Sequence, residues 1–168
     1  GPATAAGFLT SGGTESILCG VLAARERGRA ERGITAPEMV LPESAHAAFH
    51  KAAHLFGIKV HKTPVQSDWT ADVAAMARAI NRNTVLLVGS APQYPQGVID
   101  PIPDIAALAR TVDANCHVDA CMGGFRTAVC RDAGPGVHSR SRRLRGPRCL
   151  ARQGLVSRSA DTARFAAF

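Results

Sequence analysis

The sequence predicts an α/β fold, in which helices cover a largely parallel sheet. Short apolar stretches with strand character alternate with longer stretches of helical periodicity over residues 8–125. The clearest strand is the continuous apolar run at 84–88, as expected when both faces of a strand are covered. The chain has 168 residues, which is enough for one domain with a sizeable core.

The expected elements have recognisable start and stop signals. The first helix carries apolar residues on one face and stops at Gly33. Ser44 is placed to cap the second helix, which Gly57 can terminate. In chain order we expect helix 14–32, strand 39–41, helix 45–56, strand 58–60, a helix from Asp68 or Thr70 to Ile80, strand 84–88, helix 104–111 and strand 116–119.

Positive charge is confined to the last part of the chain. Residues 1–125 hold 10 Lys+Arg and 11 Asp+Glu, for a net charge of −1, whereas residues 126–168 hold 10 Arg and 2 Asp, for +8, and the two sum to the +7 of the whole chain. This Arg-rich tail has no interleaved aromatic residues and no RNA-binding motif, so we expect no nucleic-acid partner. Its apolar residues show no periodicity, which predicts little stable structure there.

Composition also bears on compartment and metals. The five cysteines form no CxxC pair, which favours free thiols in a reducing compartment and disfavours zinc, so we expect a cytoplasmic protein without a metal site. No apolar run approaches the ~20 residues of a transmembrane helix, and residues 1–7 lack the pattern of a signal peptide. Because the chain begins almost directly on a motif, we expect an N-terminal part to be missing.

Three features carry candidate chemistry. The Gly-rich turn at 11–13 leads into a helix, and free N–H groups at a helix N-terminus suit a phosphate. Asp119 ends a predicted strand, where α/β sheets bind ligands and where a carboxylate can hold a proton on a heterocyclic nitrogen. His46 lies near a helix start, on the same side. Taken singly, each has a commoner explanation: an ordinary helix start, a turn cap and a surface histidine.

Six ordered segments together resemble the pyridoxal-phosphate (PLP) enzymes of fold type I, with the sphingosine-1-phosphate lyases as the better match. The segments are 10–17, 37–40, 44–53, 83–92, 97–102 and 117–125. The resemblance implies that residues 1–125 form the central portion of a PLP fold type I (aspartate aminotransferase-like) large domain, followed by a non-native tail at 126–168. The glutamate decarboxylase branch shares only the general plan and is the alternative.

The resemblance also implies roles for individual residues. Gly13 and Thr14 would hold the cofactor phosphate, His46 would stack on the pyridine ring, and Asp119 would keep the ring nitrogen protonated, so that the ring acts as an electron sink. Less specifically, the cofactor pocket would also be lined by Ser90 and Cys121. The implied reaction is retro-aldol cleavage of a phosphorylated long-chain amino alcohol to a fatty aldehyde and phosphoethanolamine, by a homodimeric enzyme.

One residue of that family is absent. The Schiff-base lysine lies a few tens of residues after the position of Asp119, but the only lysines here are Lys51, Lys59 and Lys62. With suitable codons, reading the tail one base later gives a family-like stretch containing Leu-Pro-Phe. We therefore hypothesise a frameshift after Phe125 and expect this chain to be inactive. A non-catalytic PLP- or phosphate-binding subunit remains the alternative from another functional class.

Overall fold

A computed structural model describes residues 7–123 and the backbone of residues 165–167. It confirms the α/β class, with a five-stranded sheet in the order β2-β1-β3-β4-β5, all neighbours parallel. The elements are α1 (Gly13–Arg32), β1 (Glu38–Pro42), α2 (Ala48–Phe56), β2 (Lys59–Thr63), α3 (Val73–Ala79), β3 (Thr84–Ser90), α4 (Ile102–Thr111), β4 (Asn115–Asp119) and β5 (Phe165–Ala167).

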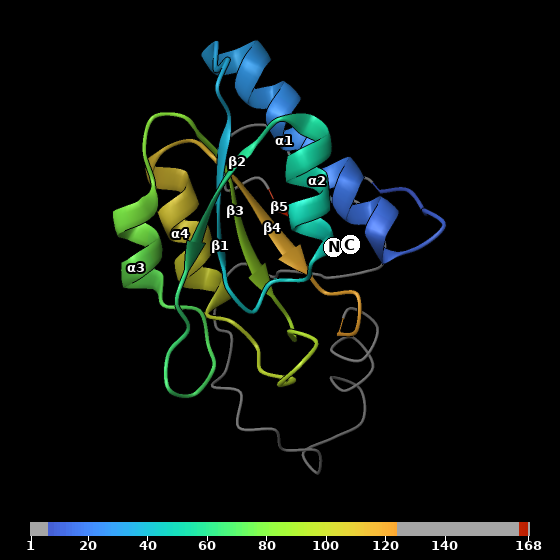
Figure 1. Cartoon of the computed structure of the whole chain (residues 1–168), viewed down its shortest axis with the longest axis vertical. Coiled ribbons are helices and arrows are strands. Elements are labelled where there is room, and N and C mark those ends of the chain that lie inside the picture. Colours follow the sequence, from blue (N-terminus) through green and yellow to red (C-terminus); the bar gives the residue numbers. More distant parts are fainter. Residues whose placement is uncertain (1–6, 124–164, 168) are drawn as a thin grey trace.

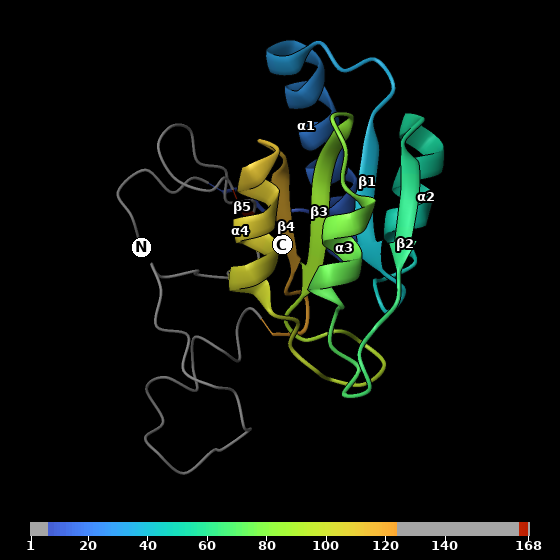
Figure 2. The same cartoon turned by 90° about the vertical axis from the view of Figure 1, so that its left-hand side faces the viewer.

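Helices cover both faces of the sheet, α1 and α2 on one side and α3 and α4 on the other (Figures 1 and 2). The core accordingly has two halves. Ile17 and Phe49 pack with Val88 on the first side, whereas Met76 and Ile105 pack with Leu87 on the second. Since β3 supplies buried residues to both halves, its continuous apolar sequence follows directly from its central position.

Two arginines fix the direction of α1 across the sheet. Arg27 donates to the side chain of Asn115, at the start of β4, at 2.8 Å. Arg32 donates to the carbonyl oxygen of Thr84, at the start of β3, at 2.9 Å. Because the C-terminal half of α1 is tied to the strand starts, its N-terminus lies at the opposite edge, where the strands end.

The predicted caps are only partly correct. The hydroxyl of Ser44 is buried and makes no hydrogen bond to the described residues, and α2 begins at Ala48 with Ala47 as its N-cap, so the expectation for Ser44 was wrong. The helix expected from Asp68 or Thr70 begins at Val73, because Asp72 accepts a hydrogen bond from the N–H of Ala75 at 2.9 Å. Asp68 instead caps a tight turn through Thr70.

Strand β5 is an element that the sequence does not predict. It pairs through its backbone with Cys116 to Val118 of β4. Backbone pairing needs no alternating side-chain pattern, so an irregular sequence can supply it. The remaining residues of the predicted tail, 126–164 and 168, lie outside the described residues, and the predicted division of the chain after residue 125 stays a prediction.

Candidate functional site

Asp119 lies where β4 ends, on the α1–α2 side of the sheet. Side chains alternate along a strand, and His117, two residues earlier, packs edge-on against Phe49 of α2, with ring centroids 5.1 Å apart. The carboxylate of Asp119 accepts the N–H of Cys121 at 3.2 Å. Burial raises the pKa of Asp119, opposed by that hydrogen bond and by the charge of His46. The site therefore holds a half-buried carboxylate at the strand edge.

The N-terminus of α1 meets this same edge. No side chain caps the helix at Gly12. A Cβ added at Gly13 would lie 2.9 Å from the Sγ of Cys121, so the helix start and the turn after Asp119 are in close contact. Only glycine permits this approach without a shift of the thiol. Uncapped N–H groups and the positive end of the helix dipole are thereby placed beside Asp119.

His46 occupies the turn between β1 and α2, and its side chain is exposed. Its Nδ1 accepts the N–H of Ala48 at 3.1 Å, which gives the helix the acceptor expected from Ser44. This bond fixes the ring relative to the start of α2. Its charge acts on the carboxyl of Asp119, so His46 belongs to the same local environment even though it lies on a different element.

Ser90 ends β3 and pairs in register with Asp119 on β4. Beyond it, the N–H of Ala91 donates to the carbonyl oxygen of Asp119 at 2.8 Å. A Cβ added at Gly123 would lie 1.9 Å from the carbonyl oxygen of Ala91, so the turn after β4 lies directly against the chain after β3. Main-chain contacts therefore join the end of β3, Ser90 and Ala91, to the end of β4 and its turn, residues 119–123, and we call this joined segment the ledge.

All six predicted site residues thus gather at one edge of the sheet: Gly13, Thr14, His46, Ser90, Asp119 and Cys121. The arrangement fits PLP. An uncapped helix N-terminus suits a phosphate dianion, and a half-buried carboxylate beside it can hold a proton on a pyridine nitrogen. The role of each residue stays a prediction.

Sequence reasoning missed two buried polar residues beside this edge. Asp100 and Gln93 are both 2% exposed. Asp100 accepts two main-chain N–H groups, and Gln93 donates from Nε2 to the carbonyl oxygen of Trp69. Both lie in the Gly- and Pro-rich loop after β3. An Asp within a stretch of apolar and Pro residues, Val98 to Ile102, was the available signal.

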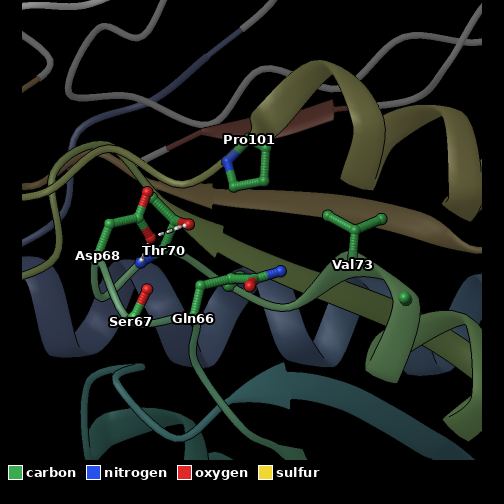
Figure 3. Close-up of a pocket in the computed structure, with 8 residues that line it drawn as sticks. Gln66, Ser67, Asp68, Thr70, Val73 and Pro101 are labelled. Atoms are coloured by element: carbon green, nitrogen blue, oxygen red, sulfur yellow. Dashed lines mark hydrogen bonds between the residues drawn. The ribbon is translucent and has the colours of Figure 1, made fainter.

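A hollow of about 370 Å³ lies elsewhere, beside α3 and the start of α4 (Figure 3). It is lined by Gln66, Ser67, Asp68, Thr70, Ala71, Val73, Ala74 and Pro101. Its carboxylate is already engaged, since Asp68 accepts both the N–H and the hydroxyl of Thr70. Because Ala71 belongs to the α3–α4 half of the core, the hollow lies on the other side of the sheet from His117 and Asp119.

The described residues form neither a metal site nor a membrane-spanning helix. Within residues 7–123, no three His, Cys, Asp or Glu side chains come together as a metal site. No helix among the described elements combines the length and apolar character needed to cross a bilayer. Among the described residues, Cys19 and Cys121 are free thiols.

The model of the class-V aminotransferases matches residues 7–126. The chain belongs to this family. The match begins just before the Gly-rich turn at 11–13 and ends just after the turn that follows β4. Enzymes of this family and the lyases related to it depend on PLP and act on small molecules.

Individual relatives of this chain are sphingosine-1-phosphate lyases. The chain is 48% identical to a rat sphingosine-1-phosphate lyase over 95% of its length and 50% identical to a rice sphingosine-1-phosphate lyase over 76%. It spans about a quarter of each relative, 27% and 24% respectively. The predicted resemblance is confirmed. The rat match extends past residue 126, into the segment that the sequence separates as a tail.

Solved structures agree with this assignment. A Burkholderia pseudomallei sphingosine-1-phosphate lyase matches 80% of the chain, and the chain covers 31% of it, with 47% identity and a TM-score of 0.76. A Lactobacillus brevis glutamate decarboxylase matches 73% of the chain, which covers 31% of it, at 23% identity and a TM-score of 0.62. The decarboxylase shares the fold, and the lyase shares the sequence as well.

Proposed function

We propose that this chain forms the cofactor-binding portion of a PLP-dependent carbon–carbon lyase of the sphingosine-1-phosphate lyase type. The observation that carries the proposal is the meeting of the α1 N-terminus, His46 and Asp119 at one sheet edge. Gly13 and Thr14 would hold the phosphate of PLP, and Asp119 would receive the nitrogen of its ring. The substrate class is a phosphorylated long-chain amino alcohol, which the intact homodimer splits into a fatty aldehyde and phosphoethanolamine.

The residues have distinct tasks in this proposal. The N–H groups of Gly13 and Thr14 bind the phosphate, and Asp119 holds a proton on the ring nitrogen. His46, whose ring is fixed by the hydrogen bond from the N–H of Ala48, would lie against the cofactor ring. Ser90 and Cys121 would line the rest of the cofactor pocket. Bound PLP supplies an electron sink that stabilises negative charge at the carbon next to the amine.

The 168-residue chain is proposed to bind the cofactor without turnover. No lysine follows Asp119 in the sequence, and the three lysines present are exposed on α2 and β2. Lys59 lies near the start of β2 and pairs with Glu38 at 3.7 Å, at the edge of the sheet away from Asp119. The same observation favours a second candidate function, a PLP-binding subunit without catalysis. We propose a cytoplasmic location, because the spacing of the five cysteines in the sequence favours a reducing compartment.

The test is a titration of the chain with PLP, followed by absorbance and fluorescence. Asp119→Asn removes the charge that holds the ring proton and is expected to weaken binding about 10- to 100-fold, as for loss of a charged hydrogen bond. The matched control is Asp113→Asn, just before the other end of β4, where the side chain is exposed and φ is 51°. Asn tolerates that conformation, so binding should be unchanged. Equal affinities for the two variants would contradict the proposal.

A chimaera with a homologous lyase separates the two candidate functions. Since the chain spans about a quarter of its relatives, residues 7–125 replace the matching segment of a homologous lyase in a chimaera. A lyase portion should then support release of a long-chain aldehyde from sphingosine-1-phosphate, whereas a dedicated binding subunit should bind PLP and release none.

A further inference from the structure

Asp100 is a buried carboxylate to which neither the family resemblance nor the proposed mechanism assigns a role, although it lies in the matching segment 97–102. It lies just before α4 and is 2% exposed. Burial raises its pKa, which its main-chain hydrogen bonds oppose. Burying a carboxylate is costly unless its oxygens are hydrogen-bonded. Its partners therefore indicate what this position stabilises.

Each carboxylate oxygen accepts one main-chain N–H from a different segment. Oδ2 accepts Ser90 at 2.7 Å, and Oδ1 accepts Ala71 at 2.9 Å. The N–H of Asp100 donates to the carbonyl oxygen of Ser90 at 3.0 Å. Ser90 is thus held through both of its main-chain groups by a single residue. A Cβ on the adjacent Gly89 would lie 2.8 Å from Ile102 and from Ile105, so α4 presses closely on the same strand end.

Ser90 is linked to Asp119 through main-chain contacts of the next residue. The next residue, Ala91, donates its N–H to the carbonyl oxygen of Asp119 at 2.8 Å, and its own carbonyl oxygen lies against Gly123. No side-chain flexibility intervenes, since every link after Asp100 is main chain. A change at Asp100 should therefore move the ledge on which Asp119 sits more than the α1 N-terminus, which contacts the ledge through the side chain of Cys121 rather than through main chain.

We propose that Asp100 is a positioning residue, which clamps the end of β3 and thereby sets Asp119 for the ring of the cofactor. This inference rests on the proposed function for the identity of the ligand. It predicts an asymmetric effect: loss of the clamp weakens recognition of the pyridine ring, while binding of phosphate at Gly13 and Thr14 continues.

The test compares Asp100→Asn with two matched variants of the full chain. An amide has one acceptor oxygen, so in Asp100→Asn either Ser90 or Ala71 faces an NH₂ donor. In Asp68→Asn, by contrast, both existing hydrogen bonds go to Oδ1 and can be retained. Met76→Ala truncates a fully buried side chain of α3 and serves as the control for general loss of stability. PLP and inorganic phosphate are titrated separately, and amide hydrogen exchange is measured without ligand.

Asp100→Asn should weaken PLP binding about tenfold while changing phosphate binding less than twofold, with faster exchange at Ala91. Asp68→Asn and Met76→Ala should leave the ratio of the two affinities unchanged. A fall of both affinities together, or an equal change in Met76→Ala, overturns the proposal. If the parent chain binds no PLP, the proposed function fails, and exchange at Ala91 still decides whether Asp100 holds the ledge. If Asp100→Asn does not fold, amide exchange of the parent chain tests the proposal instead. The amide of Ser90 should then exchange as slowly as that of Val88, and faster exchange at Ser90 would refute the hydrogen bond to Asp100.

Discussion

The contact between Gly13 and Cys121 gives a quantitative test of the site geometry. A Cβ at residue 13 would lie 2.9 Å from the Sγ of Cys121 and 3.8 Å from its Cβ. The first distance is too short for a real contact, and the second is an ordinary one. Gly13→Ala should therefore clash only with the thiol, which must rotate or push the turn away from the helix.

The expected energies follow from these two distances. Overpacking of this size costs roughly 1–3 kcal/mol, and replacing Gly by Ala within a helix recovers up to about 1 kcal/mol. Gly13→Ala should thus lower the free energy of unfolding by about 1 kcal/mol. In a Cys121→Ala background the clash is absent, and the same substitution should be neutral or slightly stabilising. The coupling energy between the two positions should then be about 1–2 kcal/mol.

Equilibrium urea unfolding of the four proteins of this cycle measures the coupling. The control cycle replaces Gly12, where a Cβ meets nothing within 4 Å and φ is 169°. Ala is a poor N-cap, so Gly12→Ala has its own cost, but that cost should be the same with and without Cys121. A coupling for Gly13 below about 0.3 kcal/mol, the range for independent sites, would refute the close approach of α1 to the turn after β4.

Three further predictions concern a cap, a histidine and the lysines. Asp72→Ala should lower the free energy of unfolding by about 1 kcal/mol, whereas Ser44→Ala should not, because of these two side chains that of Asp72 caps a helix and that of Ser44 does not; equal losses in urea unfolding would contradict this. Burial lowers the pKa of His117 to about 3; the unfolded chain binds a proton below about pH 6.5, so stability that is complete above that pH falls by about 1.4 kcal/mol per unit toward pH 3. His117→Leu should flatten this slope in unfolding curves between pH 7 and 4, and an unchanged slope would show that His117 is not its source. Borohydride treatment in the presence of PLP should fix no stoichiometric label on Lys51, Lys59 or Lys62 by mass spectrometry, and a single labelled lysine that supports turnover would overturn the assignment.

Most of the sheet could be predicted from the sequence because apolar runs and helical periodicity report burial directly. The run at 84–88 identified the central strand, and Gly33 and Gly57 end their helices in the left-handed conformation, as predicted. Helix starts were harder. Ser44, Asp68 and Asp72 are all chemically suitable caps, and the choice among them depends on which side chain the fold brings to the free N–H groups.

The residues of the candidate site could be predicted from the sequence, but the hydrogen bonds that hold them in place could not. Gly13, His46 and Asp119 are typical of a known motif order, so their convergence could be expected. The clamp by Asp100 could not, because its partners, Ser90 and Ala71, belong to segments that only the fold brings together. The frameshift hypothesis concerns residues outside the description, and the nucleotide sequence around codon 126 tests it.

The central claim, that the edge formed by the α1 N-terminus, His46 and Asp119 holds PLP, is tested most directly by following backbone amide signals during a PLP titration. The largest shifts should occur at Gly13 and Thr14 and at Ala120 and Cys121, with a smaller change near His46. Largest shifts in the hollow at 66–74, or no shift at the sheet edge at saturating PLP, would contradict the claim.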